Sequence, residues 1–129
     1  MLKLLSSIYL GHDGGGKDPS ITNMSILTWN VRGLNGNLKQ REVTELIKKL
    51  QVPLVVLLET HTKKGREKEF TKKLPSYAYF CNHEAHHNGR ILVLWKQSEI
   101  RLFILFASAH VVHCSVSTCL LYTSDAADE

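Results

Sequence analysis

Two polar side chains, Asn30 and Glu59, stand where apolar stretches of this 129-residue sequence end. Asn30 follows the mainly apolar residues 26–29, and Glu59 closes the continuous apolar run 54–58. A carboxylate at the end of a buried strand is costly unless it is paired or bound to a cation. Amide and carboxylate oxygens are ligands that a hard ion such as Mg²⁺ prefers. Asn30 and Glu59 are therefore our candidates for catalytic and metal-binding residues.

Asn30 also has a purely structural interpretation. Gly33 and Gly36, with Asn35 between them, predict a loop directly after the first apolar stretch. Asparagine is common at such turns because its side chain can bond to the backbone nearby. Its position alone therefore leaves two roles open, capping a turn and binding a ligand.

The elements that would position this pair form a strand–helix–strand unit. Residues 26–31 favour a strand, and the segment from Lys39 to Leu50 repeats apolar residues at i, i+3, i+4 and i+7, which predicts an amphipathic helix. The run 54–58 has the length and composition of a strand buried on both faces. The two strands of such a unit are parallel, so Asn30 and Glu59 would lie at the same edge of one sheet.

After this unit the sequence predicts a short helix and then four strands with short links. Short links between successive strands indicate antiparallel hairpins. The expected fold class is therefore α/β, with a βαβ unit followed by a β-meander in a mixed sheet. The expected helix runs from Arg66 to Leu74, and the strands are Tyr77 to Cys81, Arg90 to Trp95, Glu99 to Ala107 and His110 to Ser117.

Regular patterning is confined to the middle of the chain. Near the start, residues 8–10 could form a strand, and residues 11–17 match the first positions of a phosphate-binding P-loop. Asp18 stands where that loop needs Ser or Thr, so a flexible glycine linker is the preferred interpretation. The predicted organisation is a flexible extension over 1–23, a partial domain over 24–117 and an unrelated acidic tail over 118–129.

The net charge of +4 favours anionic partners, nucleic acid first. Basic residues concentrate between Thr60 and Lys73, where six lysines and arginines outnumber Glu67 and Glu69. This segment could contact phosphates near the active edge, or it could be the solvated face of a helix. Both interpretations remain open.

Cys81 and the neighbouring His83, His86 and His87 suggest a zinc cluster. Their spacing fits no standard structural zinc site, so a histidine-rich surface loop is the preferred interpretation. The three cysteines form no Cys-x-x-Cys pair, which indicates reduced thiols in an intracellular compartment, nuclear or cytoplasmic. No apolar run approaches the ~18–20 residues of a membrane span, so no membrane partner is expected.

Four separated motifs together resemble a known family. In their order and spacing they are similar to the endonuclease domain of plant LINE-type (non-LTR) retrotransposons, in the endonuclease/exonuclease/phosphatase superfamily. The resemblance extends from Ser25 to Ser117. The motifs are MSILTWNVRGLN at 24–35, KQREV at 39–43, VLLET at 56–60 and GRILVLW at 89–95.

The resemblance implies a four-layer α/β sandwich, of which this chain would carry the N-terminal half, and Mg²⁺-dependent hydrolysis of phosphodiesters in DNA. It implies that Asn30 helps to hold the phosphate and the metal, and that Glu59 is a metal ligand. Family members nick DNA to prime reverse transcription, so the parent polyprotein would carry a reverse transcriptase.

Two C-terminal motifs of the family, an Asp-x-Asn motif and a terminal Asp-His pair, have no counterpart in this sequence. Asp125 and Asp128 lie in the tail without the partner residues, and His110 and His113 lie on a predicted strand. We therefore expect a truncated endonuclease that is inactive as this fragment, with a weak or incomplete Mg²⁺ site, and whether the chain is an enzyme stays open. The alternative is a non-catalytic basic fragment that binds nucleic acid. Half a sandwich would also expose residues 102–107.

Overall fold

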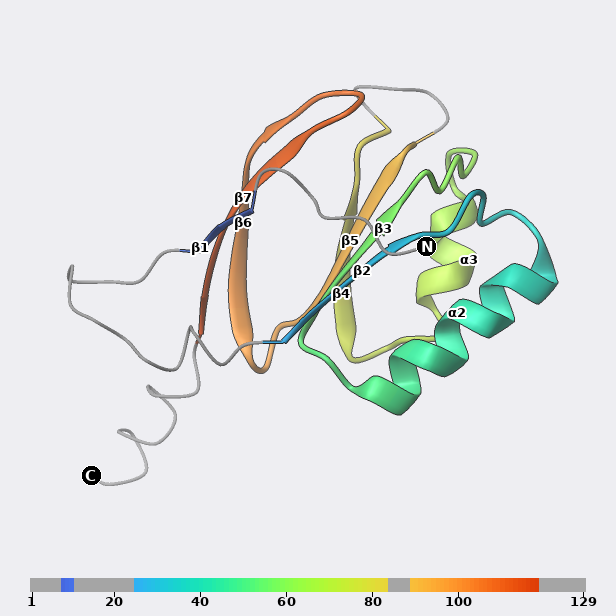
Figure 1. The fold of residues 1–129 in the computed structure, drawn as a ribbon, viewed down its shortest axis with the longest axis horizontal. Coiled ribbons are helices and arrows are strands. Elements are labelled where there is room, and N and C mark those ends of the chain that lie inside the picture. The colour runs from blue at the N-terminus through green and yellow to red at the C-terminus, as the bar shows by residue number, and fades with distance from the viewer. Residues whose placement is uncertain (1–7, 11–24, 84–88, 119–129) are drawn as a thin grey trace.

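The structure is a computed structural model that describes residues 8–10, 25–83 and 89–118. Its elements form three layers, in which two helices cover a four-stranded sheet and a three-stranded sheet packs on the other side (Figure 1). The elements are β1 Ile8–Leu10, β2 Ile26–Asn30, α2 Asn37–Leu50, β3 Leu54–Leu58, α3 Arg66–Thr71, β4 Tyr77–Cys81, β5 Ile91–Lys96, β6 Ile100–Ala107 and β7 Val112–Thr118.

The four-stranded sheet has the order β2-β3-β5-β4 and is mixed. Strands β2 and β3 are parallel and are connected through α2, whereas β5 is antiparallel to both β3 and β4. The predicted βαβ unit and mixed α/β sheet are therefore confirmed. All five residues of β3 are buried, as expected of a continuous apolar run with cover on both faces.

The predicted meander is wrong at one connection. Strands β5 and β6 follow each other closely in the chain, yet they lie in different sheets. Strand β6 pairs antiparallel with β7, and β7 pairs parallel with β1. Val93 of β5 and Ile100 of β6 are buried in the same apolar cluster between the sheets. Packing the two strands face to face removes both side chains from water, which pairing them edge to edge would not achieve.

Two separate cores explain why β3 is apolar at every position and β5 is apolar from Ile91 to Trp95. One core lies between the helices and the four-stranded sheet and includes Leu57, Ile47 of α2 and Phe70 of α3. The other lies between the two sheets and includes Val56 and Val116 of β7. Because successive side chains of a strand point to opposite faces, one strand contributes to both cores in turn.

Helix α2 begins two residues before the predicted start and holds the loop that precedes it. Val43 and Ile47 bury one face of the helix, as the periodicity predicted. The buried Gln40 donates from Nε2 to the carbonyl oxygen of Leu34 at 2.8 Å. This hydrogen bond fixes the chain between β2 and α2 to the first turn of the helix.

The predicted domain limits fall largely outside the described residues. Strand β1 lies within the expected extension 1–23 and pairs with β7, whereas the P-loop-like segment 11–17 is not among the residues that the structure describes. Thr118 ends β7, and the rest of the expected tail is also outside the described ranges. Neither of the two described helices is long and apolar enough to cross a membrane.

The outer face of the three-stranded sheet carries exposed apolar side chains. Phe103 and Leu105 of β6 are 63% and 64% exposed, and Phe106 is 55% exposed. Among the described residues no helix covers this face (Figure 1). Leu102 and Ile104 instead turn toward the core between the sheets, so the predicted exposure of residues 102–107 is confirmed for Phe103, Leu105 and Phe106.

One buried side chain, Asn82, connects the two sheets. Its Oδ1 accepts hydrogen bonds from the backbone N–H groups of Arg90 at 2.8 Å and Ile91 at 3.0 Å. Its Nδ2 donates to the carbonyl oxygens of Ser108 at 2.8 Å and Ala109 at 3.3 Å. Asn82 therefore ties the start of β5 to the turn between β6 and β7.

We predict that Asn82→Ala lowers the free energy of unfolding by about 2 to 4 kcal/mol, because several buried backbone groups lose their partner. Urea unfolding followed by circular dichroism measures the change. The matched control is Asn37→Ala, at an exposed position that begins α2, which should change stability by less than about 0.5 kcal/mol. Equal effects of the two substitutions would contradict the assignment.

Candidate functional site

Asn30 and Glu59 are in direct contact at one edge of the four-stranded sheet. The Nδ2 of Asn30 donates to Oε2 of Glu59 at 2.7 Å. The parallel register places Asn30 opposite Leu58, so Glu59 follows one residue beyond the pair. The predicted convergence of these two side chains is confirmed, while their catalytic and metal-binding roles stay predictions.

Both polar atoms of the Asn30 side chain are engaged. Its Oδ1 accepts a hydrogen bond from the backbone N–H of Arg32 at 3.2 Å. Since a carboxylate only accepts and a backbone N–H only donates, one orientation of the amide satisfies both neighbours. Asn30, which is 7% exposed, therefore caps the turn and orients Glu59 at the same time.

The backbone around this contact is strained. Arg32, Glu59 and His61 have φ angles of 53°, 55° and 50°, a left-handed conformation that side-chain-bearing residues rarely adopt. Gly33 has a φ of 101°, which glycine tolerates without that cost. Strained residues cost about 1–3 kcal/mol each and cluster at functional sites. The backbone N–H of Gly33 donates to the carbonyl oxygen of Glu59 at 2.7 Å and helps to hold this geometry.

Three loops meet at this edge, and each contains a buried polar atom without a partner. The loops are joined by backbone hydrogen bonds from Leu34 to Thr60 at 2.9 Å and from Thr60 to Arg90 at 3.2 Å. Within the described part of the chain, the unpartnered atoms are Asn35 Oδ1, Thr62 Oγ1 and Arg90 Nε. Buried polar atoms are normally satisfied by protein, water or an ion, so this edge is suited to a polar ligand.

The donor set at this edge fits part of a magnesium coordination sphere. The second oxygen of Glu59, Oε1, has no hydrogen bond to another described residue. Mg²⁺ commonly keeps several waters and binds one or two carboxylates together with substrate phosphates. Across the described ranges, no three His, Cys, Asp or Glu side chains gather to hold a metal. Glu59 could therefore be a direct ligand in a weak site, with Asn30 as its hydrogen-bonding neighbour.

The basic segment extends along α3 and the loop before it. Arg66 donates from Nη2 to the carbonyl oxygen of Asn35 at 3.1 Å and forms a salt bridge with Glu69 at 3.3 Å. The other basic residues of the segment are exposed, namely Lys63, Lys64, Lys68, Lys72 and Lys73. Exposure is required both for contact with phosphates and for a solvated face, so both predicted interpretations stand.

Cys81 and His83 lie together, and no group of three potential metal ligands forms among the described residues. Their Sγ and Nε2 atoms are 3.8 Å apart, and the same Nε2 is 2.8 Å from the carbonyl oxygen of Thr62. Burial raises the pKa of the Cys81 thiol to about 11, so at neutral pH it is protonated and a poor nucleophile. His86 and His87 lie outside the described residues.

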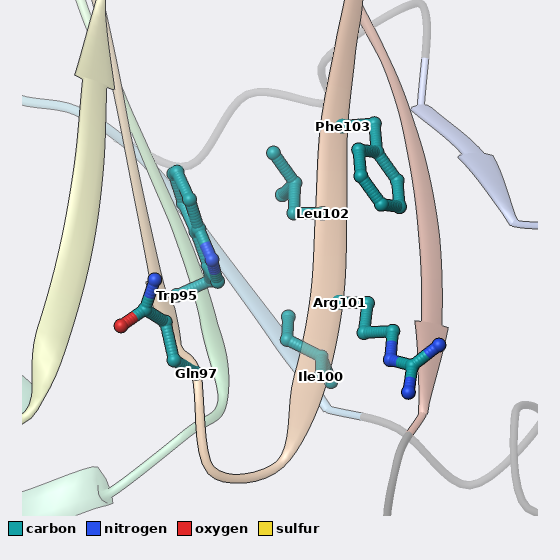
Figure 2. A pocket seen from close by; sticks show the side chains of 6 residues that line it. All are labelled: Trp95, Gln97, Ile100, Arg101, Leu102 and Phe103. Atoms are coloured by element: carbon teal, nitrogen blue, oxygen red, sulfur yellow. The ribbon is translucent and has the colours of Figure 1, made fainter.

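A pocket of about 230 Å³ lies away from this site. Figure 2 shows Trp95 of β5 pointing toward β6, with Leu102 on the facing side. Trp95 pairs with Leu54 at the beginning of β3, whereas Asn30 pairs with Leu58 at its end. The pocket therefore lies at the opposite end of these strands from Asn30. Neither Asn30 nor Glu59 lines this pocket. The full lining is Trp95, Gln97, Ile100, Arg101, Leu102 and Phe103.

Sequence reasoning missed several residues at or near this edge. Arg90 belonged to a recognised motif, but its place beside Thr60 depends on the pairing of β5 with β3, which no local pattern specifies. The buried contact between Glu67 and His83 was also missed, since Glu67 looked like one charge in a basic helix. An acidic residue on the buried face of a helix is the signal that could have identified it.

Comparison with known proteins shows similarity in fold. No protein-family model matches the chain, and no curated protein matches it. The solved structure of D. rerio TDP2 complexed with a single-strand DNA product matches with a TM-score of 0.58 at 18% sequence identity, over 74% of this chain and 41% of that one. A humanized D. rerio TDP2 matches with a TM-score of 0.51 at 20% identity, over 62% and 32% of the two chains.

A third match is an endonuclease/exonuclease/phosphatase protein from Bacteroides vulgatus, with a TM-score of 0.49 and 15% identity over 63% of this chain and 33% of that one. The chain thus spans between about a third and two fifths of the length of these solved structures. The TDP2 match shows that the chain has part of an endonuclease/exonuclease/phosphatase-type α/β sandwich.

We predict that Cys81 reacts with iodoacetamide at least about tenfold more slowly than an unstructured cysteine at pH 8, because little of it is thiolate when its pKa is about 11. The rate should keep rising with pH up to about pH 10. Mass spectrometry of the labelled peptides separates Cys81 from the other cysteines, and urea-unfolded protein is the control. A plateau in the rate near pH 8 would show an ordinary thiol.

Proposed function

We propose that the chain is part of a magnesium-dependent phosphodiesterase that acts on DNA, that it derives from a retrotransposon endonuclease, and that this fragment has no nuclease activity by itself. The observation that carries the proposal is the 2.7 Å contact between Asn30 and Glu59 at the carboxyl ends of two parallel strands. Ligands commonly bind in α/β sheets at such strand ends.

The residues of this chain would bind and orient the reacting groups. Glu59 would bind Mg²⁺ through its carboxylate, and Asn30 would keep that carboxylate in place by its hydrogen bond. A bound Mg²⁺ would supply charge to stabilise a phosphate oxygen in the transition state. Arg32 is exposed beside this contact, where its guanidinium suits a phosphate oxygen of the DNA backbone.

The proposed lack of activity depends on what else phosphodiester hydrolysis needs. A general base that activates water contributes about 10²- to 10⁴-fold to such rates. Neither the Asp-x-Asn motif nor the Asp-His pair of the resembled family occurs in this sequence. One carboxylate and one amide would therefore bind a metal weakly without completing the reaction.

The proposed substrate and origin are supported from two directions. The TDP2 structure that matches this fold contains a single-strand DNA product, which supports DNA as the partner. The WNVRGLN motif at 29–35 supports a retroelement origin, with a reverse transcriptase in the parent polyprotein. An intracellular location, nuclear or cytoplasmic, follows from a DNA substrate and is part of the same proposal.

We predict that the chain does not nick supercoiled plasmid DNA above background in millimolar Mg²⁺, because the sequence has neither the Asp-x-Asn motif nor the Asp-His pair of the resembled family. Agarose gel electrophoresis measures the conversion to open circles, and Glu59→Gln defines the background. Nicking by the unchanged chain that disappears in Glu59→Gln would overturn the proposed inactivity.

The same protein should nevertheless bind a divalent ion at this edge. Mn²⁺, used as a paramagnetic substitute for Mg²⁺, should broaden the side-chain amide signals of Asn30 in NMR spectra. The broadening should be lost in Glu59→Gln and kept in Glu42→Gln, whose carboxylate is on the exposed face of α2. Equal broadening in both variants would contradict Glu59 as the ligand.

A second candidate function is non-catalytic binding of nucleic acid, which the exposed lysines around α3 favour. We predict that Lys63→Ala with Lys64→Ala weakens binding to an oligonucleotide and reduces its salt dependence by about 1 to 2 in log–log slope. Fluorescence anisotropy at several salt concentrations measures both quantities. The matched control replaces Lys48 and Lys49, which are exposed in the last turn of α2.

If DNA binding depends on the Lys63/Lys64 pair but not on Glu59, the basic-fragment function is favoured over the endonuclease-derived one. Equal losses for the two lysine pairs would instead indicate attraction by net charge alone.

A further inference from the structure

Glu67 of α3 and His83 after β4 form a buried pair outside the contact between Asn30 and Glu59. Their side chains are 8% and 10% exposed, and Nδ1 of His83 lies 3.6 Å from Oε2 of Glu67. Nε2 of His83 lies 2.8 Å from the carbonyl oxygen of Thr62. Both carboxylate oxygens of Glu67 accept from the backbone N–H of Gly65, at 3.1 and 3.0 Å. The pair therefore contacts loop 59–65 at two points.

These contacts define where protons can lie on the imidazole ring of His83. A carbonyl oxygen only accepts, so Nε2 carries a proton and donates it to Thr62. In a neutral ring, the lone pair of Nδ1 would then face the carboxylate of Glu67. In a charged ring, Nδ1–H faces that carboxylate and forms an ion pair. The geometry therefore fits an imidazolium paired with Glu67.

Within the described residues, Cys81 and Tyr79 are titratable neighbours of His83 that are neutral near pH 7. Burial raises the pKa of the Cys81 thiol, whose Sγ is 3.8 Å from Nε2. Burial also raises the pKa of Tyr79, and the charge of Glu67 adds to that shift. Gly89, which precedes β5, packs closely against this pair. A Cβ atom at Gly89 would lie 2.7 Å from both Cys81 Sγ and His83 Nε2. Glu67 is thus the charged partner that the described residues provide.

Loop 59–65 begins at Glu59, so its conformation determines where that carboxylate lies. The Nδ2 of Asn35 donates to the carbonyl oxygen of His61 at 2.9 Å. The carbonyl oxygen of Thr62, one residue further, is held by His83. Because Glu59 and His61 are in the strained left-handed conformation, these external contacts are needed to keep the loop in place.

We propose that Glu67 and His83 are positioning residues for the candidate metal site, where their charged pair holds loop 59–65 in the conformation that directs Glu59 toward Asn30. The role of the metal rests on the proposed function, whereas the hold on the loop does not depend on it.

Hydrogen exchange tests the hold on the loop without any metal. The amides to follow are those of Gly33 and Leu34, which donate to the carbonyl oxygens of Glu59 and Thr60. Their protection factors should be about tenfold lower in His83→Gln, which keeps a donor for the carbonyl oxygen of Thr62 but removes the charge that faces Glu67.

Two further variants complete the comparison. Glu67→Gln keeps an acceptor for Gly65 but removes the charge, and it should lower the protection factors to a similar extent. His113→Gln alters an exposed histidine on β7, and it should behave like the unchanged chain. If His83→Gln fails to fold, Glu67→Gln still decides the matter. Unchanged protection of Gly33 and Leu34 in Glu67→Gln overturns the proposal.

The Mn²⁺ broadening of Asn30 tests the link to the site. Changes to residues that hold a metal ligand in place typically weaken metal binding about 10- to 100-fold, so Glu67→Gln should need at least about tenfold more Mn²⁺. Unchanged Mn²⁺ binding, together with lost loop protection, would overturn the positioning role. Absence of Mn²⁺ binding in the unchanged chain would instead overturn the proposed function, while the exchange data would still decide whether the pair holds the loop.

Discussion

The parallel pairing of β2 with β3 is the constraint on which the rest of this structure depends. Parallel neighbours need a long connection, which α2 provides, and they need cover on both faces, which the helices and the second sheet provide. Their common direction brings both carboxyl ends to one edge, where Asn30 meets Glu59. An antiparallel pairing of the same two strands would place these side chains at opposite edges of the sheet.

The sequence predicted the part of this arrangement that local patterns encode. Periodicity identified β3 and β4 to the residue and α2 to within two residues, and the βαβ rule brought Asn30 and Glu59 together. It failed where the outcome depended on packing between distant segments. The split of β5 and β6 between two sheets follows from burial of Val93 and Ile100, and the roles of Asn82 and Glu67 follow from neighbours that are far apart in the chain.

The site is open on one side, and this agrees with the limited share of the matched structures that the chain spans. In the described part of the chain, β2 is an edge strand of its sheet, so Asn30 has β3 on one side and no paired strand on the other. The loops from β3 and β5 surround Glu59, whereas nothing described closes the opposite side. The described residues thus hold the carboxylate of Glu59 in place from one side, through its hydrogen bond with Asn30.

The left-handed conformation of Glu59 has a consequence for how the chain would change over generations. Glycine or asparagine at this position would relieve about 1 kcal/mol of backbone strain, so glutamate is not the residue that the fold prefers here. Under the proposed function, stability and metal binding would pull in opposite directions at one codon, and selection for binding would keep the carboxylate at the expense of stability.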